Sequence, residues 1–138
     1  MSDEVFLSVS SDSRHLCLIR GVTEKIAKSM GFSEEESART VLALDEACCN
    51  IIKYSYGKGD SGKIEITFQV FPDVLEITIR DYGKFGKDFD IARIRCCEDK
   101  AVEPGGYGIN IMRSVMDRVE YTPCTGKGNI LTMSKRVA

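Results

Sequence analysis

Residues 44–54 of this 138-residue chain have the sequence LDEACCNIIKY. As a helix, this stretch places Glu46 and Asn50 one turn apart on the same face, with Lys53 and Tyr54 just beyond them. A carboxylate, a carboxamide and an ammonium group cost free energy to bury unless they find partners. A polyphosphate bound together with Mg²⁺ would supply them, because an oxygen-donor side chain can ligate Mg²⁺ and a lysine can contact a phosphate. The alternative is an amphipathic helix whose polar face meets water.

Length and composition are those of one globular domain, with 43% hydrophobic and 29% charged residues. The net charge of -2 gives no electrostatic argument for binding nucleic acid or an anionic membrane. No apolar run approaches the roughly 20 residues that span a bilayer, and the acidic N-terminus does not read as a secretory signal. We therefore expect a single domain over residues 1–138, in the cytoplasm, with no direct contact to nucleic acid or membrane.

The six cysteines do not form a metal-binding or disulfide pattern. Two pairs are adjacent in sequence, Cys48-Cys49 and Cys96-Cys97, no C-x-x-C occurs, and His15 is the only histidine. This layout predicts reduced thiols, several of them acting as small core residues. A redox role for Cys96-Cys97, in a segment that reads as a loop, is the alternative.

Two helices are predicted in the first half of the chain. The first has an apolar face from Leu16 to Met30, a cap from Ser11 or Ser13, and Gly31 as its stop. The second begins with a capping-box pattern, Ser33 with Glu36, runs to about Ser55 and so contains the opening stretch. Further helical patterns cover residues 91–96 and 109–116.

Strands are predicted from alternating apolar residues and turn signals. A short strand covers residues 5–9, residues 63–71 and 75–81 form a hairpin around Pro72-Asp73, and residues 119–121 and 130–133 form a final hairpin. The order segregates helices from strands and predicts an α+β fold, a two-layer α/β sandwich. We expect a mostly antiparallel mixed sheet with the helices on one face.

Two further segments have unusual glycine signatures. The first is Asp81-Tyr82-Gly83-Lys84-Phe85-Gly86 after an apolar strand, where the Asp can accept a hydrogen bond from an exocyclic amine. The second is residues 105–112, GGYGINIM, where glycines open a helix whose N–H groups favour phosphate. Alone, each fits an ordinary turn or flexible loop; together with Glu46 and Asn50, in this order, they indicate a nucleotide site.

On these motifs the sequence resembles the GHKL ATPase superfamily, and more closely the anti-sigma factor serine/threonine kinases of the RsbW and SpoIIAB type. Residues 46–56 match the N box of that family, Asp81-Tyr82-Gly83 its first glycine box, and residues 105–109 with Met112 its second. Residues 128–131, GNIL, stand where the family has its closing Gly-Thr strand. The resemblance covers nearly the whole chain and implies the Bergerat fold.

The resemblance also implies roles for single residues. Asn50 would ligate the Mg²⁺ that bridges the ATP phosphates, Glu46 would be the general base, and Asp81 would bind the adenine amino group. Asp45 points about 100° away around a helix, which favours Glu46 as the base. The cofactor-binding positions for ATP and Mg²⁺ are Asn50, Lys53, Asp81, Gly83, Gly106, Gly108 and Ile109, the glycines at 106 and 108 belonging to a mobile ATP lid.

The implied function is an ATP-dependent serine/threonine protein kinase that acts as an anti-sigma factor. It would phosphorylate a STAS-type anti-sigma antagonist, sequester a sigma factor and form a homodimer. Three departures are visible: Tyr54 replaces a histidine common in relatives, with Lys53 as a substitute phosphate contact, Asn129 replaces the usual threonine, and the spacing from Gly83 to Phe89-Asp90 is stretched by inserted residues. The alternatives are an ATP-binding switch that sequesters a partner without phosphorylation, and an interaction domain that binds no nucleotide.

The first helix offers a further interpretation. Its basic residues would either meet water, as most charged helix faces do, or form a partner surface. They are Arg14, Arg20, Lys25 and Lys28.

Overall fold

The computed structural model describes residues 3–56, 62–83, 112–125 and 128–137. Its elements are the strands β1 (Asp3–Ser10), β2 (Lys63–Val70), β3 (Val74–Asp81), β4 (Arg118–Thr125) and β5 (Gly128–Arg136), and the helices η1 (Ser13–His15), α1 (Leu16–Ser29), α2 (Glu34–Asn50) and η2 (Ile51–Ser55). Residues 112–115 are also helical. The predicted helix at 91–96 and residues 109–111 of the one at 109–116 lie outside the described residues.

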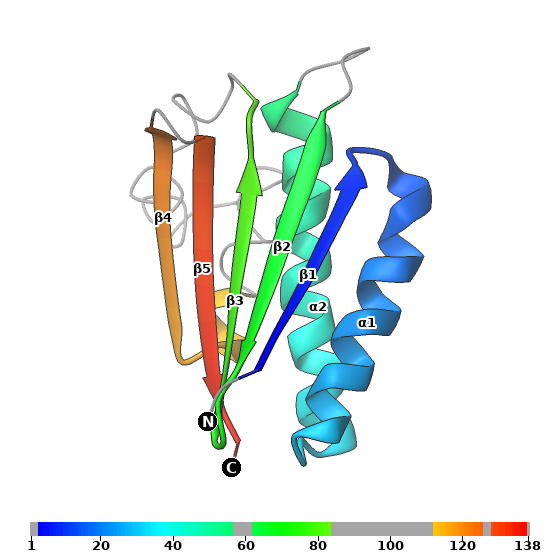
Figure 1. The fold of residues 1–138 in the computed structure, drawn as a ribbon, viewed down its shortest axis with the longest axis vertical. Helices are drawn as coiled ribbons and strands as arrows, with labels where there is room; N and C mark the ends of the chain where they lie inside the picture. The colour runs from blue at the N-terminus through cyan, green and yellow to red at the C-terminus, as the bar shows by residue number, and fades with distance from the viewer. Residues whose placement is uncertain (1–2, 57–61, 84–111, 126–127, 138) are drawn as a thin grey trace, which may run out of the picture.

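The strands form one sheet in the order β1-β2-β3-β5-β4, and every pairing within it is antiparallel. Helices α1 and α2 lie together on one face of this sheet, as Figure 1 shows. The prediction of a two-layer α+β fold with helices on one face is therefore confirmed. Because all pairings of the described strands are antiparallel, the first residue of β2 and the last residue of β3 lie at the same end of the sheet. Helix η2, which continues from α2, lies at this end as well (Figure 1).

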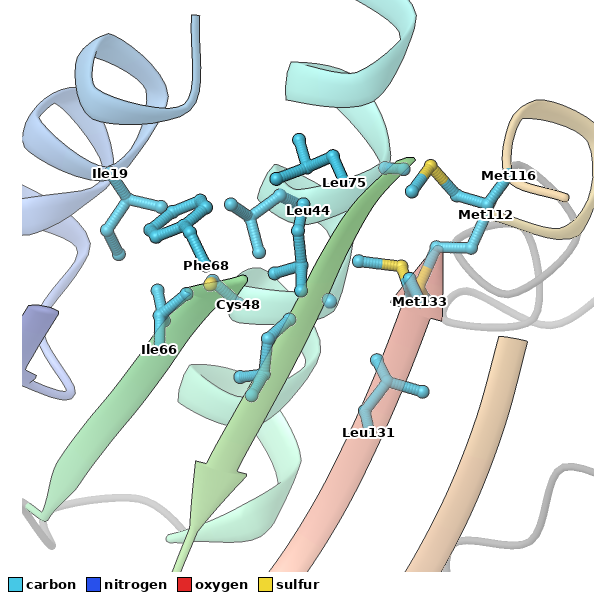
Figure 2. Packing of buried hydrophobic residues seen from close by; sticks show 14 of the residues in the cluster. Ile19, Leu44, Cys48, Ile66, Phe68, Leu75, Met112, Met116, Leu131 and Met133 are labelled. Carbon is cyan, nitrogen blue, oxygen red and sulfur yellow. The ribbon is translucent and has the colours of Figure 1, made fainter. Parts of the chain in front are cut away.

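The core lies between the sheet and the helices, and the alternation of the strands builds it. Ile64, Ile66 and Phe68 of β2 are fully buried, as are their counterparts in β3, whereas the residues between them are more exposed. Leu44 and Cys48 of α2 pack toward these strands, as Figure 2 shows. Met112 and Met116 pack against the same core on the side of α2 opposite α1 (Figure 2).

Helix ends follow local chemistry. Ser33 caps α2, since its hydroxyl accepts a hydrogen bond from the N–H of Glu36 at 3.1 Å. Gly31 has a φ of 96°, the left-handed conformation that ends a helix, as predicted. The expected cap of the first helix was wrong: Asp12 caps η1 by accepting from the N–H of Arg14 at 2.9 Å. Ser11 instead accepts from the N–H of Gly62 at 3.0 Å.

Candidate functional site

Two carboxylates that are adjacent in the last two turns of α2, Asp45 and Glu46, differ in their partners. Arg20 of α1 donates to Asp45 across a distance of 2.7 Å, and this hydrogen bond raises the pKa of the Arg20 guanidinium. Glu46, half-buried, forms neither a hydrogen bond nor an ion pair with the residues that the structure describes. Asp45 is thus engaged in holding α1 to α2, while Glu46 keeps its carboxylate available.

Asn50, the last residue of α2, is buried with 8% of its surface exposed. Its Nδ2 has no hydrogen-bond partner among the described residues. A buried N–H donor without an acceptor costs about 1–3 kcal/mol, a cost that a ligand oxygen accepting from Nδ2 would remove. The neighbouring face of α2 is apolar, because Ala47 and Cys48 pack into the core, and burial raises the pKa of the Cys48 thiol far above its usual range.

This position fits Mg²⁺ bound with a polyphosphate. Mg²⁺ uses one or two protein oxygens and otherwise substrate phosphates and water, so a single carboxamide oxygen from Asn50 suffices. The described part of the chain contains no group of three or more His, Cys, Asp or Glu side chains that could hold a metal without such a substrate. Nearby, Lys53 is exposed in η2, a π-helical turn of the kind frequent at functional sites.

The second part of the site is a closed ring of hydrogen bonds at the end of β3. Oδ1 of Asp81 accepts from Nδ2 of Asn129 at 2.8 Å and from the N–H of Gly83 at 3.0 Å. Nδ2 of Asn129 also donates to the carbonyl of Gly83 at 2.9 Å. Asp81 and Asn129 are 2% and 1% exposed, respectively, and face each other in the β3–β5 register. The carboxylate predicted to read an exocyclic amine is therefore held in one orientation.

Gly128 allows this approach of β5 to β3. It has a φ of 94°, and a Cβ at this position would lie 2.4 Å from the carbonyl oxygen of Asp81. Only glycine fits both the conformation and the space. The sequence placed Gly128 and Asn129 in a closing strand, but it did not indicate that Asn129 orients Asp81.

Tyr56 connects the helical part of the site to the strand part. Its hydroxyl donates to the carbonyl of Lys63 at 2.5 Å and accepts from the N–H of Tyr82 at 2.8 Å. Burial raises the pKa of this phenol, which keeps it protonated as the donation requires. The sequence predicts the strands beside these partners but not that Tyr56, the last residue of the 46–56 match, reaches them.

Gly106, Gly108 and Ile109 lie outside the described residues, as do Cys96 and Cys97. The structure therefore describes the site at the ends of α2 and β3. Among the described cysteines, Cys17, Cys48 and Cys49 are free thiols.

The charged face of the first helix is largely paired within the chain. Arg14 contacts Asp12 at 2.8 Å and Lys28 contacts Glu24 at 2.9 Å, both pairs at the surface. Such exposed pairs add little to stability, because water screens the charges. No helix in the described part of the chain is long and apolar enough to span a membrane.

Comparison with known proteins shows the family to which the sequence of this chain is similar. Residues 9–135 match the histidine kinase-like ATPase domain. Serine-protein kinase RsbW of Bacillus pumilus (strain SAFR-032) is 30% identical over 132 residues, covering 90% of this chain and 81% of the relative. RsbW of Oceanobacillus iheyensis is 28% identical, covering 99% of this chain and 88% of the relative, and RsbW of Bacillus subtilis (strain 168) is 29% identical, covering 86% and 77%.

Proposed function

Because the chain belongs to the histidine kinase-like ATPase domain family and to its RsbW serine-protein kinases, we propose that it is an ATP-dependent serine/threonine protein kinase acting as an anti-sigma factor. Its substrate is a STAS-type anti-sigma antagonist, and its sequestered partner is a sigma factor. It works as a homodimer in the cytoplasm. The observation that carries the proposal is the buried Nδ2 of Asn50, which finds no hydrogen-bond acceptor among the described residues and could donate to a phosphate oxygen, one helical turn from Glu46.

The described residues support contacts to different parts of one nucleotide. Asp81, held by Asn129 and Gly83, accepts a hydrogen bond from the adenine amino group. Asn50 would contribute one oxygen ligand to Mg²⁺. Bound Mg-ATP supplies the phosphoryl group and neutralises the charge that develops during its transfer.

Glu46 then acts as the general base. It accepts the proton from a serine or threonine hydroxyl of the antagonist as that oxygen bonds to the γ-phosphorus and the bond to the ADP oxygen breaks. Its position one turn before Asn50 supports this role, because it would bring the proton acceptor close to the phosphates. Asp45 is excluded from this role because Arg20 already holds it.

The test is phosphate transfer from labelled ATP to a STAS-type antagonist, compared between Glu46→Gln and the neighbouring control Asp45→Asn. We expect Glu46→Gln to lower the transfer rate by about 10²–10⁴-fold, the usual contribution of a general base, with nucleotide affinity retained. Asp45→Asn should transfer phosphate at nearly the wild-type rate. Equal rates in wild type and Glu46→Gln would remove Glu46 as the base.

A second function is favoured by one departure from the family pattern, the tyrosine at position 54. In this case ATP binding controls capture of the partner, and no phosphate is transferred. Wild-type protein that binds Mg-ATP and the sigma factor but labels no antagonist would establish this switch in place of the kinase.

A further inference from the structure

The pairing of β2 with β3 ends at Asp81, a residue of the proposed site. Ile64 and Asp81 are the last paired residues, so Lys63 and Tyr82 would form the next pair of the ladder. Instead, the N–H of Tyr82 donates to the hydroxyl of Tyr56, and that hydroxyl donates to the carbonyl of Lys63. One phenol oxygen thus stands between two strand ends that would otherwise bond directly.

The ring of Tyr56 is fixed as firmly as its hydroxyl. A Cβ added to Gly62 would lie 2.0 Å from Cε1 of Tyr56, so the ring packs directly over the backbone of that glycine. Gly62 is itself tied to Ser11, whose N–H donates to its carbonyl at 2.7 Å and whose hydroxyl accepts from its N–H at 3.0 Å. The phenol therefore has little freedom to shift relative to the sheet.

Tyr56 follows Asn50 by less than two helical turns and contacts the residue directly after Asp81. We propose that Tyr56 is a positioning residue, whose hydroxyl fixes the distance between Asn50 and the Asp81–Gly83 turn so that one nucleotide reaches both. This inference rests on the proposed ATP binding. Asn50 serves the phosphate side and Asp81 the adenine side, and neither contact requires Tyr56 when made separately.

The consequence is a specific pattern of affinities. If Tyr56 sets a distance, its loss weakens a ligand that spans both contacts and leaves unchanged a ligand that makes only one. Misplacement by about 1 Å can cost up to 10²-fold when two groups must act together. A residue that only stabilised the fold would instead weaken all ligands alike.

The experiment measures Mg-ATP, adenosine, and magnesium tripolyphosphate binding to wild type and Tyr56→Phe. Phenylalanine keeps the ring over Gly62 and removes both hydrogen bonds of the hydroxyl. We expect the Kd of Mg-ATP to rise about 10-fold while adenosine and tripolyphosphate bind within about twofold of wild type. Gly62→Ala, which displaces the ring but keeps the hydroxyl, should produce the same pattern.

The matched control is Tyr82→Phe. It removes a phenol that contacts Glu65 and leaves the backbone N–H of Tyr82 on Tyr56. We expect all three ligands to bind it as they bind wild type.

Two results would overturn the inference alone: unchanged Mg-ATP affinity in Tyr56→Phe, or a parallel loss for all three ligands. Absence of Mg-ATP binding by the wild-type protein would overturn the proposed function, and this inference with it.

Discussion

Replacing Asn129 with alanine should destabilise the protein because it breaks the ring of hydrogen bonds at the end of β3. The variant loses one bond to the Asp81 carboxylate, at 2.8 Å, and one to the neutral carbonyl of Gly83, at 2.9 Å. A bond to a charged group contributes about 1.5–3 kcal/mol and one between neutral groups about 0.5–1.5 kcal/mol. Since Asp81 and Asn129 are almost fully buried, water cannot replace either bond easily. We therefore expect the free energy of unfolding to fall by about 2–4 kcal/mol.

Urea unfolding at neutral pH measures this change. With a slope of about 2 kcal/mol per molar urea, the midpoint should fall by roughly 1–2 M while the slope stays the same. Thr132→Ala is the control, because Thr132 is a polar residue of the same strand, only partly buried. Its midpoint should shift by less than half as much. A midpoint for Asn129→Ala equal to that of the control would refute the argument that this amide organises Asp81.

Three further predictions concern the rest of the fold. Gly128→Ala should cost more stability than Gly31→Ala in thermal unfolding: both glycines have positive φ, about 1–2 kcal/mol of strain for alanine, but only at 128 would the Cβ also meet a backbone oxygen, at 2.4 Å. Ser33→Ala should lower the free energy of unfolding by about 1 kcal/mol, since it removes the cap of α2, and a change near zero would contradict that role. Because the Cys48 thiol is buried, the free energy of unfolding should fall as the pH rises into the alkaline range. Its folded pKa is raised, so its contribution is complete below the unfolded pKa of about 8.5 and declines above it by about 1.4 kcal/mol per pH unit; Cys48→Ala, followed by urea unfolding from pH 8 to 10, should show a shallower decline.

The sequence predicted the fold well because its layers follow from local periodicity. Alternation along residues 63–71 and 75–81 identified two half-buried strands and their buried faces. Ser33 and Gly31 carry cap and stop chemistry that acts within a few residues, so the boundary between the helices was also predictable. The cap of the first helix was assigned wrongly because three adjacent residues, 11–13, can all accept from an N–H, and the sequence does not decide among them.

The organisation of the site was less predictable, because it depends on strand register. Asn129 reaches Asp81 across 48 residues of sequence, and only the pairing of β3 with β5 brings them together. Tyr56 likewise bridges Lys63 and Tyr82 at the end of a ladder whose last pair no sequence pattern specifies. Glu46 and Asn50 were predictable as a pair because both lie on one helix, where spacing alone fixes their relation.

The most direct test of the account is calorimetric titration of Mg-ATP into wild type, Asn50→Ala and Asp81→Asn. Wild type should bind the nucleotide at submillimolar concentration; Asn50→Ala should lose the effect of Mg²⁺ on affinity, and Asp81→Asn should lose the preference for ATP over GTP. No heat from wild type at millimolar Mg-ATP, or identical affinities in all three proteins, would contradict a nucleotide site between the ends of α2 and β3.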